Sequence, residues 1–349
     1  LTVPAFRRLT VDGRPQLVST SSQSARTDDR GRYRFSRLAP GDYVVVVPLT
    51  QSTLPTSTYD SLLQAVIADP VKPPEWAYDL LLSGGMQALQ GSPARVGDVM
   101  WSTSYTATPP PSERGRSTSY RTTYYPSATS LTLASVIAVR SGEERSGIDL
   151  QLSLVPTVRV SGTVQGPAGP MANLAVRLQP AIADPTAAGS DVDGATAITR
   201  ADGAFTFINI PTGQYVVKVL RNSPSETVMR VIRGEIGAGS PTAPATPPTS
   251  TAPAMPTLFA EQPLTIGDSH VTGVSIMMRE APKVSGRVEF ELKNPTTLSQ
   301  MQAGLGVMLM PLGGPPAAIT LIATDPAMVD ADGRFKTVGY APDRYSIIF

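Results

Sequence analysis

The chain has 349 residues, and its 29 lysines and arginines nearly balance 28 acidic residues, which gives a formal net charge of +1. Because charges of both signs are interspersed, the composition excludes the basic surface that nucleic acids or anionic lipids require. Cysteine is absent, which excludes disulfides, thiolate catalysis and cysteine-ligated metals. Proline accounts for 34 residues, nearly twice the usual ~5%, and this opposes helices and predicts an all-β protein.

The first predicted element is a hairpin at residues 27–47. An Asp-Arg-Gly sequence ending at Gly31 predicts a turn in which the glycine has a positive φ. The alternation that follows puts Tyr33 and Phe35 on one face and arginines on the other, which is typical of a half-buried strand. A Pro-Gly turn then reverses the chain, and the valines at 44–47 predict a strand buried at most positions.

The same hairpin recurs at 199–219 and 329–349. In each copy an aromatic residue follows the turn glycine by two positions, and a tyrosine follows it by 12 (43 − 31, 215 − 203 and 345 − 333). The turn glycines are Gly31, Gly203 and Gly333, and the tyrosines are Tyr43, Tyr215 and Tyr345. Three copies of one hairpin predict three copies of one domain.

Further strands are predicted on either side of the hairpins. A Val-Ser-Gly sequence predicts an opening strand at 158–164 and again at 283–288. Alternating apolar residues predict a closing strand at 147–154 and at 273–278. The first copy therefore lacks its opening strand, and the third copy lacks its closing strands.

Three tandem Greek-key β-sandwiches are predicted, at 1–156, 157–281 and 282–349, in agreement with the two or three domains that the length favours. The first contains an insertion at about 49–125, and the second a Pro/Thr-rich insertion at about 234–257. Within the first insertion, Tyr59 to Ala68 has helical spacing, with Thr58 or Asp60 as the cap and Pro70 as the stop. No apolar run is long enough to span a membrane.

The Val-Ser-Gly strands, the Asp-Gly-Arg-Phe turn and the Pro-Gly-Asp-Tyr-Val-Val run resemble the carboxypeptidase regulatory-like domain family. This resemblance covers residues 1–48, 124–224 and 258–349 and implies a transthyretin-like (prealbumin-like) β-sandwich. The tandem arrangement looks like long repeat proteins of environmental Gram-negative bacteria. Such domains are attached to peptidases, outer-membrane transporters and surface proteins, where they serve as stabilising, spacing or binding modules.

Catalytic and metal-binding patterns are weak. His270 is the single histidine, and its Ser and Asp neighbours lie in the same short turn, too close in sequence for a catalytic relay. Two Asp-x-Asp-Gly sequences, at 191–194 and 330–333, imitate the start of a calcium loop but lack its further ligands. No metal site, catalytic residue or cofactor is predicted.

The first insertion offers carboxylates and aromatic rings. Two interpretations stay open: a glycosidase-like pair of carboxylates with aromatic platforms, or a small core under the insertion in which Trp76 and Trp101 pack. The carboxylates are Asp60, Asp69, Glu75 and Asp79, and the core would also contain Tyr78, Leu80 and Leu81.

Tyrosines and arginines alternate near the end of this insertion. Such residues carry much of the energy of protein interfaces and can stack on sugars, although they equally suit a strand edge. The candidate binding or assembly residues are Trp76, Trp101, Tyr105, Tyr120, Arg121, Tyr124 and Tyr125.

These observations predict a non-enzymatic, extracytoplasmic bacterial protein with a structural or adhesive role. Its predicted partners are copies of itself or other surface proteins. A sandwich that lacks a strand exposes backbone groups, so a filament built by β-strand contacts between chains is a specific hypothesis. The alternative explanation for the incomplete outer sandwiches is that the sequence is a fragment and their missing strands belong to the rest of the chain. The alternatives are an array of carbohydrate-binding modules that binds polysaccharide, or accessory domains of a larger secreted enzyme or transporter.

Overall fold

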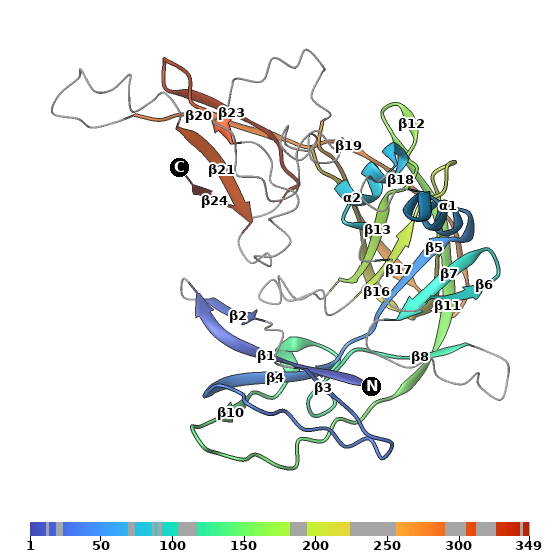
Figure 1. The fold of residues 1–349 in the computed structure, drawn as a ribbon, viewed down its shortest axis with the longest axis vertical. Coiled ribbons are helices and arrows are strands. Elements are labelled where there is room, and N and C mark those ends of the chain that lie inside the picture. Colours follow the sequence, from blue (N-terminus) through green and yellow to red (C-terminus); the bar gives the residue numbers. More distant parts are fainter. Residues whose placement is uncertain are drawn as a thin grey trace.

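The computed structural model describes residues 1–11, 14–18, 24–68, 74–85, 88, 93–103, 117–181, 194–223, 256–289, 305–311, 326–342 and 345–348. Strands dominate this part of the chain, and its two α-helices lie together at one side (Figure 1). The predicted all-β fold built of sandwiches is confirmed. The first, second and third repeats are named here after the hairpins at 27–47, 199–219 and 329–349.

The first repeat is built around strand β4, which is buried on both faces. Its odd-numbered residues Tyr43, Val45 and Val47 contact one apolar cluster, and Val44 and Val46 contact another. The sheet order is β10-β4-β1-β2, with β3 also paired to β1 and β9 to β4. The strands are β1 (Thr2–Val11), β2 (Arg14–Val18), β3 (Ser24–Arg26), β4 (Gly41–Val47), β9 (Thr123–Tyr124) and β10 (Ile137–Val139).

The second repeat has two facing sheets. In one, β11 lies between β15, to which it is antiparallel, and β18, to which it is parallel. The other contains β19-β17-β16-β13-β14, and the apolar core lies between the two. The strands are β11 (Leu154–Gly166), β12 (Gly169–Pro170), β13 (Ala175–Pro180), β14 (Gly194–Ile198), β15 (Ala204–Pro211), β16 (Gly213–Arg221), β17 (Leu258–Ile266), β18 (Val271–Met277) and β19 (Arg279–Glu280).

The third repeat pairs its Val-Ser-Gly strand β20 with β23, and β21 lies between β22 and β24. Val307, Val329 and Phe335 form its small core. The strands are β20 (Lys283–Arg287), β21 (Gly306–Pro311), β22 (Ala327–Met328), β23 (Arg334–Gly339) and β24 (Tyr345–Ile348).

The described part of the segment between β4 and β9 supplies four strands and both helices. The predicted helix is confirmed, but α1 begins at Thr56 rather than near Tyr59, because the chain leaves strand β5 directly into the helix and the Thr56 N–H donates to Asp98 O. A second, short helix was not predicted. The elements are β5 (Thr50–Pro55), α1 (Thr56–Ala68), η1 (Glu75–Ala77), α2 (Tyr78–Leu82), β6 (Ala94–Val96), β7 (Val99–Thr103) and β8 (Thr118–Tyr120); a further 3-10 turn, η3 (Leu131–Leu133), precedes β10.

The three hairpin turns have the same geometry. The φ angles of the turn glycines are +77°, +78° and +77°. In each turn the glycine N–H donates to the carbonyl of the residue three positions earlier, over 3.1, 2.9 and 3.0 Å for Gly31, Gly203 and Gly333. That earlier residue also donates its N–H to the carbonyl just after the glycine, over 2.9, 2.8 and 2.9 Å. One turn has therefore been used three times, as its sequence predicts.

The tyrosine 12 residues after each glycine also has one role. Its hydroxyl donates to the carbonyl oxygen four residues earlier: Tyr43 to Ala39 over 2.6 Å, Tyr215 to Pro211 over 2.9 Å and Tyr345 to Ala341 over 2.7 Å. This bond fixes the loop that enters the second strand of each hairpin.

Two predicted strands of the first repeat do not join a sheet. Tyr33 and Phe35 do face the core while Arg32 and Arg34 face solvent, but residues 32–38 form no ladder, and neither do residues 147–153. In the second repeat the equivalent segments, β15 and β18, both pair with β11. In the described part of the first repeat no strand lies between these two segments, so neither has a neighbour with which to form a ladder.

Candidate functional site at the junction of two repeats

Strand β5 leaves the first repeat and enters the sheet of the second. Residues Thr50 to Thr53 pair in parallel with Gly194 to Ala197 of β14, and β7 and β6 continue the sheet beyond β5. The result is one eight-stranded sheet, β19-β17-β16-β13-β14-β5-β7-β6. In Figure 1 the blue β5 lies beside the strands of the second repeat, away from β1 and β4. The predicted domain boundaries stay predictions, but the two repeats share this sheet.

Polar side chains of β5 donate hydrogen bonds to backbone carbonyls of β15, which is an edge strand of the facing sheet. The Thr53 hydroxyl donates to Thr206 O over 2.5 Å, and the Gln51 amide donates to Asn209 O over 3.1 Å. Both β5 side chains are 3% exposed. An edge strand carries unpaired carbonyls that need partners when they are buried. These two bonds supply such partners from a segment more than 150 residues away.

Trp101 of β7 also contacts both β5 and β15. Its indole N–H donates to Gln51 Oε1 over 2.9 Å, and the ring packs with Val99 and with Ile208 of β15. The side chain is only 6% exposed. The sequence left two interpretations open for Trp101, a platform for a sugar or a residue that packs in a core. Its position agrees with packing and leaves no exposed ring face on which a sugar could stack.

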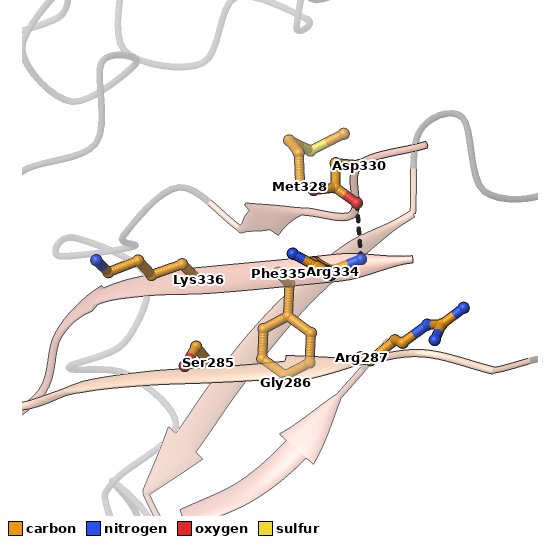
Figure 2. A pocket seen from close by; sticks show the side chains of 8 residues that line it. All are labelled: Ser285, Gly286, Arg287, Met328, Asp330, Arg334, Phe335 and Lys336. Atoms are coloured by element: carbon orange, nitrogen blue, oxygen red, sulfur yellow. Dashed lines mark hydrogen bonds between the residues drawn. The ribbon is translucent and has the colours of Figure 1, made fainter. Parts of the chain in front are cut away.

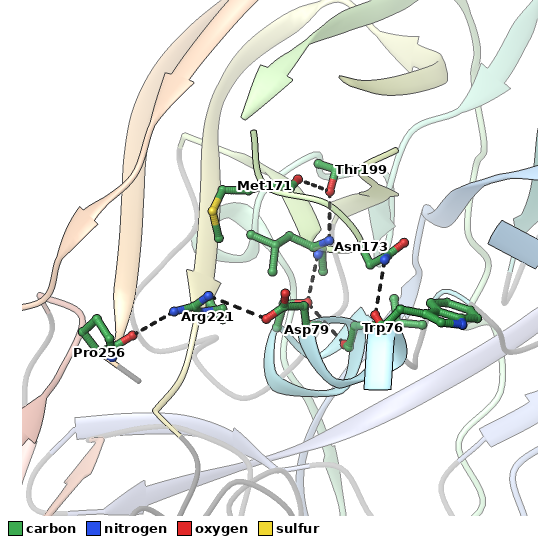
Figure 3. Close-up of polar contacts among 11 residues, drawn as sticks. Trp76, Asp79, Met171, Asn173, Thr199, Arg221 and Pro256 are labelled. Atoms are coloured by element: carbon green, nitrogen blue, oxygen red, sulfur yellow. Dashed lines mark hydrogen bonds and ion pairs between the residues drawn. The ribbon is translucent and has the colours of Figure 1, made fainter. Parts of the chain in front are cut away.

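The helix α2 covers the other side of the shared sheet (Figure 3). Leu80, fully buried, packs against Ala175 and Ile198 of the second repeat. The Ser83 hydroxyl accepts the Ala175 N–H over 2.9 Å, and the Asn173 amide donates to Trp76 O over 3.2 Å. Leu80 and Trp101 thus pack in two separate clusters, each of which includes residues of the second repeat, rather than in the single core predicted under the insertion.

Asp79 and Arg221 form a half-buried ion pair at the same place, with Oδ1 3.8 Å from Nη1 (Figure 3). Burial raises the pKa of the Asp79 carboxyl, while the Arg221 charge acts in the opposite direction. Burial is the stronger effect because the pair is too long to compensate for lost solvation. Asp60 is exposed on α1, and Asp69 lies outside the described residues. The Glu75 side chain also lies outside what the structure describes, so the glycosidase-like pair of carboxylates stays a prediction.

Two further contacts hold the repeats together. Arg121 donates to Thr212 O over 2.8 Å and to Thr212 Oγ1 over 3.2 Å. Arg200, in the turn of the second repeat, forms an ion pair with Asp98 between β6 and β7. Arg121 was a candidate for assembly, and here it joins two parts of one chain.

The remaining aromatic candidates are scattered. Tyr124 is buried in the first repeat, whereas Trp76, Tyr120 and Tyr125 are half-buried on separate elements. Tyr105 lies outside the described residues. Ligand binding by these side chains stays a prediction.

The other polar candidates serve in turns. His270 is exposed, and its Nδ1 accepts the Arg159 N–H over 3.0 Å. The Asp330 carboxylate accepts the N–H groups of Asp332 and Arg334 over 2.9 and 2.7 Å, as a turn aspartate does. Residues 191–193 of the other Asp-x-Asp sequence lie outside the described residues. Within those residues, no three His, Asp or Glu side chains gather as a metal site would require.

An open pocket lies on the third repeat (Figure 2). Phe335 packs over Gly286 on the paired strand, where a Cβ would come within 2.8 Å of the ring. Arg287 and Lys336 point to opposite sides, so the charges do not converge on a ligand. The pocket is explained by the packing of an aromatic residue on a glycine.

The facing sheets and the repeated hairpin define a tandem β-sandwich protein. Among its described helices, none has both the length and the apolar character needed to cross a bilayer. No known family profile matches the chain, and no curated protein sequence matches it.

Three solved structures have a weak similarity to it. A DUF3823 family protein from Parabacteroides merdae is 12% identical, with a TM-score of 0.20 over 38% of this chain and 50% of that one. The chain thus covers about half the length of that protein. A proposed carbohydrate-binding protein from Pseudomonas aeruginosa is 17% identical, with a TM-score of 0.23 over 35% and 89% of the two chains. A streptococcal ancillary pilin is 11% identical, with a TM-score of 0.21 over 86% and 95%. We draw no functional conclusion from similarities this low.

Proposed function

We propose that this protein is a non-enzymatic structural repeat protein of the bacterial extracytoplasmic space. Its sandwiches act as rigid spacers in a surface or extracellular assembly, and copies of the chain or other surface proteins join it through β-strand contacts. The observation that carries the proposal is the parallel pairing of β5 with β14, which places two repeats in one sheet. The resemblance of the repeated motifs to carboxypeptidase regulatory-like domains supports a spacer role.

Shared sheets suit a spacer for a mechanical reason. Domains joined only by a linker move relative to each other by default. Here a change of orientation would break the β5–β14 ladder, the Thr53–Thr206 bond and the packing of Leu80 at once. The first two repeats therefore keep one orientation and hold their ends at a fixed distance.

The alternative of a carbohydrate-binding array depends on exposed aromatic platforms. Trp101 is buried, so among the described candidates a sugar would have to stack on Trp76 or on Tyr120 and Tyr125, which lie on different elements. The spacer role needs no such platform, and we therefore rank it first.

Distance measurements between spin labels test the proposal. Because the chain has no cysteine, Ala138→Cys with Ser275→Cys labels one exposed position in each of the first two repeats. Ala201→Cys with Ser275→Cys is the control within the second repeat. A distance distribution as narrow as that of the control is expected. A distance distribution several times broader than that of the control would refute a rigid spacer.

An activity assay tests the non-enzymatic assignment separately. Sustained turnover of a peptide or glycoside by the wild type that is lost in Asp79→Asn would refute this assignment.

A further inference from the structure

Two strands carry the chain into and out of the second repeat. β11 follows directly on residues 140–153, whose apolar side chains pack in the first repeat. β18 is followed by β19 and, after Ala281 and Pro282, by β20 of the third repeat. In Figure 1 the strands of the first repeat lie in the lower part of the molecule and those of the third repeat in the upper part. A force that pulls the outer repeats apart therefore reaches the second repeat at the amino end of β11 and at the carboxyl end of β18.

These two strands are parallel neighbours in one sheet. Five residue pairs join them, from Val160–Val271 to Gln165–Met277, and the Met278 N–H donates to Gln165 O over 2.8 Å. Opposed forces at the amino end of one strand and at the carboxyl end of its parallel neighbour slide the strands along each other. Because the hydrogen bonds run between the strands, sliding strains all of them at once. Forces at the same end of an antiparallel pair would instead break the bonds one after another.

Core packing locks the register of this ladder. Val164 and Ile276 are 0% and 1% exposed, whereas the side chain of Ser275 faces solvent. A shift by one residue would turn the exposed side of β18 into the core. A shift by two residues in the direction of the pull keeps the faces but brings Val164 to the position of Gly162, where a Cβ lies 2.0 Å from Val274 O. Neither neighbouring register fits, so the ladder has to break as a whole.

The elements beside this ladder direct the force onto it. On its other side β11 pairs with β15 at six positions, so it cannot be drawn out without breaking that ladder as well. β5, which also enters from the first repeat, is likewise parallel to its neighbour, with four pairs between Thr50–Thr53 and β14. β19 pairs with β17 at only two positions. It therefore peels off first under tension and leaves the force on β18.

We propose that the second repeat is a mechanical clamp, in which the parallel β11–β18 ladder resists tension along the chain in shear. This inference rests on the proposed function, because a spacer in a surface assembly is held at both ends and transmits any pull on that assembly. Resistance of this kind depends on the direction of the force and not on the free energy of unfolding alone, since forced unfolding is governed by the unfolding rate. The clamp is therefore tested by changing the direction of the force.

Single-molecule pulling in two directions makes this comparison on the full chain. Because the chain has no cysteine, DNA handles can be attached to pairs of cysteines introduced at exposed positions. Ser153→Cys with Lys283→Cys applies the force in shear across β11 and β18. Ser153→Cys with Gln214→Cys is the control, in which the force leaves just after β15 and unzips its antiparallel ladder with β11 from the Thr157–Pro211 pair. At one loading rate, the mean unfolding force should be at least about twofold higher for the first handle pair than for the control.

Variants measured with both handle pairs separate the clamp from general stability. Gly162→Ala places a Cβ 2.0 Å from Val274 O and forces β11 and β18 apart, so the ratio of the two unfolding forces should fall towards one. Gly267→Ala, whose Cβ would have nothing within 4 Å, is the matched control and should keep the ratio. Leu174→Ala removes a fully buried side chain that lies on neither strand, so it should lower both forces and keep the ratio. A ratio that Gly162→Ala leaves unchanged would contradict the role of this ladder.

Equal unfolding forces in the two directions in the wild type, or a higher force in the control direction, would overturn the proposal. The spin-label distances are independent of this result. Narrow distances with equal forces would refute the clamp alone, whereas broad distances with a direction-dependent force would refute only the rigid spacer.

Discussion

Thr53→Val removes one hydrogen bond between the two repeats while it keeps the shape and the strand preference of the side chain. Thr53 is 3% exposed and its hydroxyl donates to Thr206 O over 2.5 Å. Valine leaves this edge carbonyl without its donor at a part-buried position. A fully buried acceptor that loses its partner costs about 1–3 kcal/mol, so we expect the free energy of unfolding to fall by about 1 kcal/mol, the lower end of that range.

Urea unfolding followed by two signals measures this change. Fluorescence reports Trp76 and Trp101, both in the segment between β4 and β9, whereas circular dichroism reports all strands. If the repeats unfold as one unit, both midpoints move together and the m-value stays constant. Thr272→Val, at an exposed position of β18, is the control and should change stability by less than about 0.5 kcal/mol. A shift in the fluorescence midpoint alone would refute the coupling of the repeats, and no shift in either signal would refute the role of Thr53.

Three further predictions concern packing, the repeated hairpin and pH. Leu80→Ala should lower the free energy of unfolding by about 2–5 kcal/mol in urea titrations, because Leu80 is fully buried against Ala175 and Ile198; exposed Leu133→Ala is its control. The free energy of unfolding should fall by about 1 kcal/mol in each of the variants Tyr43→Phe, Tyr215→Phe and Tyr345→Phe, since each loses the hydrogen bond from the tyrosine hydroxyl to the carbonyl four residues earlier. An unchanged free energy of unfolding in one variant alone would show that the three hairpins are not equivalent. Burial raises the pKa of Asp79, so this group should lower the stability of the wild type as the pH rises from the ordinary carboxyl pKa through the raised one. Asp79→Asn removes this loss. Unfolding experiments at several pH values should therefore show that the free energy of unfolding of the variant rises relative to that of the wild type between the ordinary and the raised carboxyl pKa. A difference between the two proteins that does not change with pH would contradict the buried position of the carboxylate.

Much of the local structure was predictable from the sequence, because turns depend on neighbouring residues. The Asp-Gly turns and the valine strand at 44–47 follow from residues within a few positions of each other. The tyrosine spacing was visible in the sequence, although its hydroxyl bond to the fourth preceding carbonyl was not predicted. The turn glycine and the tyrosine 12 residues after it occur three times, which made the pattern readable without an alignment.

The junction could not be predicted in the same way. Strand β5 reads Thr-Gln-Ser-Thr-Leu-Pro, which has no apolar alternation, yet Gln51, Ser52 and Thr53 are all buried. Their burial depends on Thr206 and Asn209, more than 150 residues away, and on Trp101. The threonines favour a strand, but nothing in the local pattern indicates which sheet it joins. Residues 32–38 show the converse, because a clear strand pattern does not form a ladder without a neighbour.

Amide hydrogen exchange at β5 tests the central claim most directly. If β5 is a strand of the second repeat, the backbone amides of residues 51–53 should exchange as slowly as those of β14, with the same dependence on low concentrations of urea. Fast exchange of the β5 amides beside fully protected β14 amides would show that the two repeats do not share a sheet, and the rigid spacer would then have no structural basis.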